Sequence, residues 1–113
     1  MSVLPNTRYR TVGAVLANSS KTDVYTAGPG VYAEIVSIIV CASAGAAGVC
    51  TIHWYDVSLT TEYAYSFGDT VPAAGALDIP CYPLHFEPGD ILRVTGEAAQ
   101  HVTITMIEAG KGA

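Results

Sequence analysis

Short runs of Val, Ile, Thr and Tyr, each bounded by Gly, Pro, Asp or Asn, follow one another along the chain. No apolar stripe at helical spacing outlasts two turns, so these runs predict β-strands rather than helices. About eight strands with no helix between them favour an all-β fold, a single antiparallel β-sandwich of jelly-roll-like or immunoglobulin-like topology. The strands are expected at Tyr9–Leu16, Asp23–Ala27, Tyr32–Ala42, Val49–Asp56, Thr61–Phe67, Ala76–Leu84, Ile91–Thr95 and His101–Ile107.

Most of these strands alternate apolar and polar positions, as half-buried strands do. Ile52 and Trp54, for example, should point to one side of their strand, and His53 and Tyr55 to the other. The strand Tyr32–Ala42 is the exception, because both of its faces are largely apolar. An apolar outer face needs cover from a loop or another subunit. Its even positions are therefore candidate interface residues: Tyr32, Glu34, Val36, Ile38 and Val40.

Length and charge narrow the function further. The 113 residues form one domain, which we divide into an N-terminal arm at 1–10, a sandwich at 11–108 and a flexible tail at 109–113. Ten acidic residues against five basic ones give a net charge of −5, so no basic stripe for nucleic acid is expected. The N-terminus lacks an apolar signal region, and the longest apolar stretch is too interrupted to span a bilayer.

The candidate chemistry is sparse. Cys50 and His53 are three apart and should face opposite sides of a strand, while Cys81 and His85 are about 13 Å apart if extended. Neither pair therefore predicts a metal site, and Cys41, Cys50 and Cys81 are expected to be buried free thiols, with one disulfide as an alternative. No nucleophile elbow or phosphate loop is present, so we expect no enzyme activity, no cofactor and no metal.

Aromatic residues offer a second cue. Tyr63, Tyr65 and Phe67 alternate in one strand, which would place them on a single face, with Tyr32 and Tyr55 nearby. Such a row belongs to the core, to a protein interface or to a sugar-binding platform. Asp90, in the turn Glu87-Pro88-Gly89-Asp90, is expected to bond its own backbone.

The stretch from Val24 to Ile107 resembles small virion proteins of tailed bacteriophages. The resemblance rests on a Tyr-Thr run with a Gly/Pro turn at 24–30, an Ile/Val strand at 33–40 and a Pro-Gly-Asp-x-Leu-x-Val hairpin within 83–96. It implies a β-sandwich building block, present in many copies, that decorates the capsid or belongs to the neck or tail. It implies no catalysis and no cofactor.

Three functions follow as hypotheses. The first is a virion structural protein, made in the host cytoplasm, that binds itself as a trimer or larger and binds capsid, neck or tail proteins, but neither nucleic acid nor membrane. The second is a carbohydrate-binding module, which requires Tyr55, Tyr63 and Tyr65 to form a flat exposed platform. The third is a jelly-roll metalloenzyme, which requires His53, His85 and His101 to converge with carboxylates.

Overall fold

The computed structural model describes residues 7–17, 20–42, 47–81, 84–97 and 100–110. These ranges contain β-strands and no helix, so none of the described residues forms a helix that could cross a membrane. The strands are β1 (Thr7–Val15), β2 (Lys21–Thr26), β3 (Val31–Ala42), β4 (Gly48–Asp56), β5 (Thr61–Val71), β6 (Ala76–Ile79), β7 (Leu84–Phe86), β8 (Ile91–Thr95) and β9 (Gln100–Gly110).

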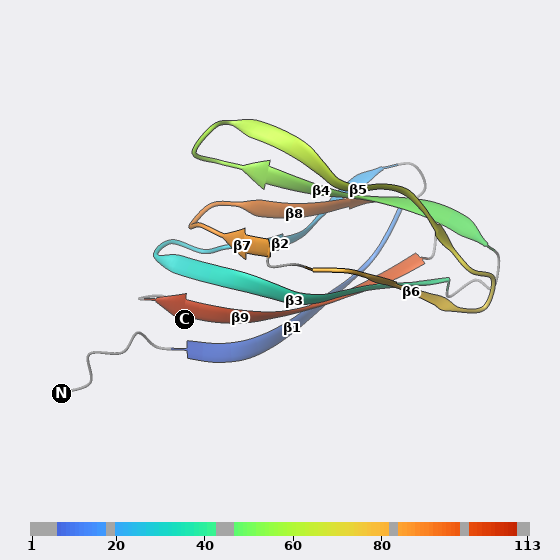
Figure 1. Ribbon diagram of the computed structural model, residues 1–113, viewed down its shortest axis with the longest axis horizontal. Helices are drawn as coiled ribbons and strands as arrows, with labels where there is room; N and C mark the ends of the chain where they lie inside the picture. Colours follow the sequence, from blue (N-terminus) through green and yellow to red (C-terminus); the bar gives the residue numbers. More distant parts are fainter. Residues whose placement is uncertain (1–6, 18–19, 43–46, 82–83, 98–99, 111–113) are drawn as a thin grey trace.

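The strands form two antiparallel sheets that pack face to face (Figure 1). One sheet has the order β1-β9-β3-β6, with β7 also paired to β3, and the other has the order β2-β8-β4-β5. Counting β6 and β7 as one interrupted strand gives eight strands in the orders 1-8-3-6 and 2-7-4-5. This is the strand order of a jelly roll, so the structure selects jelly-roll over immunoglobulin-like topology and confirms the predicted all-β sandwich.

All the predicted strands are present, but the expected strand Ala76–Leu84 is divided. β6 pairs with the C-terminal half of β3, and β7 pairs with its N-terminal half. Pro80 follows β6 directly. Because proline has no N–H to donate to a sheet, it explains why β6 ends there.

A β-bulge changes which side chains of β3 face the core. The pairing with β9 shifts register between Ile35 and Ser37. A bulge of one residue reverses the alternation, so odd-numbered residues point inward before it and even-numbered residues point inward after it. Ile38 and Val40 are consequently fully buried, and their prediction as interface residues is wrong. Tyr32, Glu34 and Val36 keep the outward orientation that was expected.

The core lies between the sheets and is built from alternate residues of every strand. β4 contributes Ile52, β8 contributes Leu92 and Val94, and β9 contributes Ile104 and Met106, as their alternation predicts.

One turn is joined to the core by a buried carboxylate. Asp90 accepts hydrogen bonds from the backbone N–H of Glu87 and Val57, both at 3.0 Å, and from Trp54 Nε1 at 3.3 Å. The predicted bond within the turn is confirmed, and the other two bonds attach that turn to Trp54 of β4 and to the β4–β5 loop. Gly89 has a φ of +91°, a conformation that glycine adopts without strain.

The first strand carries an ionic cluster that the sequence did not predict. β1 begins at Thr7, so residues 7–10, expected in an N-terminal arm, belong to the sheet. Arg8 Nε lies 2.9 Å and Arg10 Nη1 3.3 Å from the carboxylate of Glu108, which is only 2% exposed. Tyr25 Oη, on β2 of the other sheet, donates to the same carboxylate at 2.5 Å. The cluster therefore links three strands across both sheets.

Candidate assembly surface

The two outer faces of the sandwich differ in charge. We call the outward side chains of β1, β9, β3, β6 and β7 the β3 face, and those of β2, β8, β4 and β5 the β8 face. The β8 face holds an ion-pair network around Glu62, which pairs with Lys21 and with Arg93 Nη1 at 3.1 Å. Arg93 also pairs with Asp23 at 2.7 Å and lies 4.9 Å above the ring centre of Tyr55.

His53 completes this network. Its Nδ1 lies 3.5 Å from Glu62 Oε2, and its Nε2 shares a hydrogen bond with Thr95 Oγ1 at 3.0 Å. Burial lowers the pKa of His53 below its usual 6.5, and the charges of Lys21 and Arg93 add to that effect against the opposing charge of Glu62. Along β2, β8 and the second half of β4 the β8 face thus carries polar groups that are paired with one another, while Val49 on β4 and Phe67 on β5 are exposed apolar residues of the same sheet.

The β3 face carries few charges and several exposed apolar side chains. Val15 on β1 is 65% exposed, and Val36 and Ile39 on β3 are exposed as well. Cross-strand pairing places Ile39 beside Thr103 and beside Asp78, and Val15 beside His101. Exposed apolar side chains on a sheet face with few charges are typical of a surface that other chains cover. The remaining outward positions at this end are mainly Thr11, Gly13, Cys41, Thr103 and Thr105.

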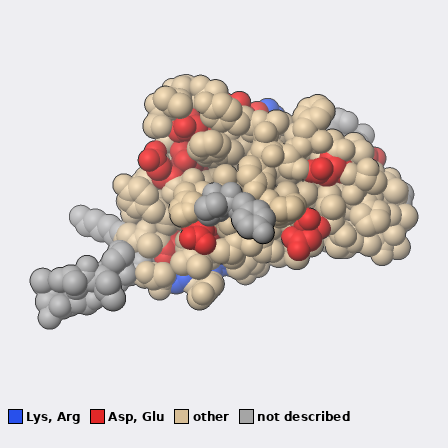
Figure 2. Space-filling view, viewed as in Figure 1, with Lys and Arg blue, Asp and Glu red and all other residues tan. Residues whose placement is uncertain are grey.

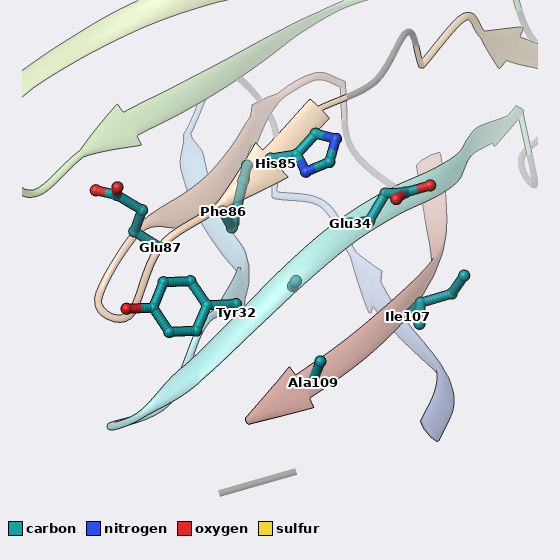
Figure 3. Close-up of a pocket in the computed structure, with 8 residues that line it drawn as sticks. Tyr32, Glu34, His85, Phe86, Glu87, Ile107 and Ala109 are labelled. Atoms are coloured by element: carbon teal, nitrogen blue, oxygen red, sulfur yellow. The ribbon is translucent and has the colours of Figure 1, made fainter. Parts of the chain in front are cut away.

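An open groove of about 400 Å³ lies at the other end of the β3 face (Figure 3). Its floor is Ile107 and Ala109 of β9, and Tyr32, which is 57% exposed, forms a wall. Glu34 and His85 lie side by side because they are register partners in β3 and β7. Glu87, just after β7, also lines the groove.

The structure brings together some of the predicted site residues and separates others. Tyr32 and Glu34 meet in the groove, and Val36 lies further along the same face. Tyr63 stacks on Trp54 with ring centres 5.3 Å apart, on the opposite sheet. Tyr65 packs against the core and donates a hydrogen bond to the Pro80 carbonyl at 2.5 Å. The tyrosines of β5 therefore lie apart from the β3 face.

The aromatic row expected in β5 does not form. The pairing of β4 with β5 shifts register twice, and Phe67 is 81% exposed while Tyr65 is partly buried. Tyr55 points to the β8 face, where Arg93 covers its ring. Tyr55, Tyr63 and Tyr65 thus do not form the flat platform that the carbohydrate-binding hypothesis requires.

The cysteines and histidines are dispersed. All three cysteines are free, and Cys41 is exposed rather than buried as expected. Burial raises the pKa of the Cys50 thiol to about 11 and also raises that of Cys81. Within the described ranges, no group of three His, Cys, Asp or Glu residues could hold a metal ion.

Sequence reasoning missed His85, Glu87 and Ile107 as parts of the groove. Glu34 and Ile107 are register partners although 73 residues separate them in the sequence (107 − 34). No local pattern signals such a contact. Pro88 indicated a turn at this position but gave no sign that Glu87 lines the groove.

Comparison with known proteins supports the fold. No protein-family model matches the sequence, and no curated protein matches it either. A chain of the Bacillus endospore appendages, a family of disulfide-linked pili, is similar with a TM-score of 0.59 at 14% identity, over 96% of this chain and 88% of that one. A chain of the T13 IBDV viral particle is similar with a TM-score of 0.59 at 9% identity.

The viral similarity concerns one part of a larger chain. It covers 94% of this protein but 31% of the IBDV chain. A chain of the infectious bursal disease virus Gx strain is similar with a TM-score of 0.58 at 8% identity, over 97% of this protein and 34% of that chain. At these identities the comparisons establish a shared β-sandwich fold. The fold thus recurs in a chain of a pilus and in a chain of a virus particle.

Proposed function

We propose that this protein is a non-enzymatic structural component of a tailed-phage virion, which assembles into a homo-oligomer through the Val15–Val36–Ile39 end of its β3 face. The observation that carries the proposal is the contrast between the two outer faces. The β8 face satisfies its charges internally, whereas the β3 face exposes apolar side chains with few charges around them. Covering such side chains removes apolar surface from water, which drives association.

The acidic groups support a structural rather than a catalytic role. Asp90 accepts three hydrogen bonds within the fold, and Glu108 and Glu62 are each held by two basic side chains. Carboxylates whose hydrogen bonds and ion pairs are all made within the fold hold strands and turns together. The phage assignment itself rests on the sequence resemblance, with the virus and pilus folds as support for assembly. Its location in the particle, as capsid decoration or as part of the neck or tail, belongs to the same proposal.

Light scattering coupled to size-exclusion chromatography tests the assembly. The wild-type protein at micromolar concentration should elute as a trimer or larger, and Ile39→Lys should shift it toward the monomer, because a charge would be desolvated in the interface. Leu59→Lys is the matched control, since Leu59 is an exposed apolar residue of the β4–β5 turn, away from the β3 face. A wild-type monomer, or equal dissociation by both variants with their folds intact, would refute the proposal.

The virion location needs a separate test. Cross-linking of purified particles, followed by mass spectrometry, should connect β3-face residues to a second copy and other residues to a capsid, neck or tail protein. Particles that lack the chain would argue against the virion role even if the isolated protein is oligomeric.

A further inference from the structure

The groove at the Tyr32 end of the β3 face is lined by two carboxylates that have no partner among the described residues. Glu34 lies on its floor side and Glu87 on its rim, and neither carboxylate forms an ion pair or side-chain hydrogen bond with any described residue. Figure 3 shows the two carboxylates at different ends of the groove, with Tyr32 near Glu87 and His85 near Glu34. The groove is open to solvent, so both charges are accessible.

The described part of the chain offers these carboxylates no unpaired Lys or Arg. Every Lys and Arg among the described residues is already held by a carboxylate of its own chain: Arg8 and Arg10 by Glu108, Lys21 by Glu62, and Arg93 by Asp23 and Glu62. On the side seen in Figure 2, acidic atoms appear at several places, while basic atoms appear only at the upper and lower margins. A second copy docking through its described residues would therefore bring no Lys or Arg that lacks a carboxylate partner of its own.

We infer that this groove binds a Lys- or Arg-bearing extended segment of a different protein. An aromatic ring and carboxylates are the groups that accept a cationic side chain, through cation–π contact and charge-assisted hydrogen bonds. The apolar floor of Ile107 and Ala109 suits the methylene stem of the same side chain. Carboxylates at two places along the groove match a segment with more than one basic residue.

The groove and the proposed self-association surface are separate parts of one sheet. Tyr32 and Glu34 precede the β3 bulge and pair with the C-terminal end of β9, whereas Ile39 follows the bulge and pairs with Thr103. A copy at one end leaves the other end available. The inference relies on the proposed function only for the partner being another protein of the assembly, since the charge argument is independent of it.

Nuclear magnetic resonance titration of the isotope-labelled protein tests the groove directly. The probe is an acetylated and amidated pentapeptide, Thr-Lys-Val-Lys-Thr, and the control peptide has Gln in place of both Lys residues. We expect the Lys peptide to move the amide signals of Tyr32, Glu34 and Glu87 with a Kd of about 1 mM, and the Gln peptide to leave them unchanged. Added salt should weaken the binding, because exposed charges are screened.

Variants then assign the effect to the two carboxylates. Glu34→Gln/Glu87→Gln should weaken peptide binding about threefold to tenfold, given the modest strength of exposed ion pairs. Asp78→Asn removes one charge from the same face outside the groove lining and should leave the Kd unchanged. Circular dichroism checks that both variants fold.

Several outcomes would overturn the inference. These are no signal movement with the Lys peptide, equal movement with the Gln peptide, or an unchanged Kd in the double variant. The fifth basic residue of the sequence, Lys111, lies outside the described residues. Movement on raising the protein concentration, abolished by Lys111→Gln, would show that a second copy occupies the groove instead. Movement with methyl glucoside but not with peptide would show a sugar site. Failure of the proposed function looks different: the wild-type chain would be monomeric whether or not the groove binds the peptide.

Discussion

The buried carboxylate of Glu108 permits the sharpest prediction about stability. The change to make is Glu108→Gln, which keeps the side chain's size and removes its charge. The carboxylate is 2% exposed and accepts from Tyr25 Oη, Arg8 Nε and Arg10 Nη1. A glutamine retains one acceptor oxygen but presents an N–H₂ group where the second oxygen was, so at least one of these bonds is lost.

The size of the effect follows from how exposed each partner is. A hydrogen bond to a charged group contributes about 1.5–3 kcal/mol when it is buried, which applies to Tyr25. The Arg8 and Arg10 side chains are 53% and 46% exposed, so each of their contributions is discounted to at most about 1 kcal/mol. Because the amide keeps part of the Tyr25 bond, we expect Glu108→Gln to lower the free energy of unfolding by about 2 kcal/mol at pH 7. In a domain of this size that corresponds to a fall in Tm of about 8–10 °C.

The pH dependence gives this prediction its sign. Burial would raise the pKa of Glu108, but the bonds from Tyr25 and Arg8 and the charges of Arg10 and Arg8 outweigh it, so the pKa is lowered. The unfolded chain therefore binds this proton more readily than the folded one, and the stabilisation is present above the ordinary glutamate pKa and lost as the pH falls through the folded-state pKa. The stability gap between wild type and Glu108→Gln should be full at pH 7 and close under acid conditions.

Urea unfolding of both proteins between neutral and acid pH, followed by circular dichroism, measures this gap. Glu34→Gln is the control, because it makes the same substitution at a carboxylate without an ion pair to any described residue, and it should lower the free energy of unfolding by at most about 0.5 kcal/mol. A difference in free energy of unfolding below about 0.5 kcal/mol at pH 7, or a difference that does not decrease as the pH is lowered, would show that the ionic cluster does not stabilise the fold.

Three further predictions concern other described groups. Asp90→Ala should lower the free energy of unfolding by about 3 kcal/mol, because it leaves the N–H groups of Val57 and Glu87 and the Trp54 indole without their acceptor. A change in Trp54 fluorescence should accompany this loss, and unchanged urea unfolding would contradict the prediction. His53 should titrate below 6.5 in nuclear magnetic resonance spectra, so the stability of wild type should fall more steeply from pH 7 to pH 5 than that of His53→Gln; parallel pH profiles would count against this. Cys41 should react first with a thiol reagent and more slowly at high protein concentration, where the β3 face is covered, while Cys50 should react only on unfolding; fast reaction of Cys50 in the native protein would contradict its burial.

Much of the fold followed from the sequence because strands leave a local signal. The alternation around Ile52 and Ile104 assigned their faces correctly, and the Pro-Gly-Asp turn marked Asp90 as a turn residue. The break between β6 and β7 also had a signal, since Pro80 stands inside the expected strand.

The errors arose where the structure depends on partners far along the chain. The bulge in β3 has no marker such as glycine or proline at Val36, so simple alternation placed Ile38 and Val40 outside. Arg8 and Glu108 are 100 residues apart, and the groove combines β3, β7 and β9. Spacing arguments within a segment do not reveal contacts of this kind.

The β3 bulge also sets how the strand tolerates mutation. Before Val36 the intolerant positions should be odd-numbered, and after it they should be even-numbered, because the bulge reverses which side chains fill the interior. A saturation-mutagenesis profile of residues 31–42 would then change phase once, at the bulge. Deleting Val36 would remove that phase change and leave Ile35, Ser37 and Ile38 in regular alternation, so both halves of the strand would keep their apolar side chains in the core. Deleting Ile39 would instead turn Val40 toward water, so it should be far more damaging than deleting Val36.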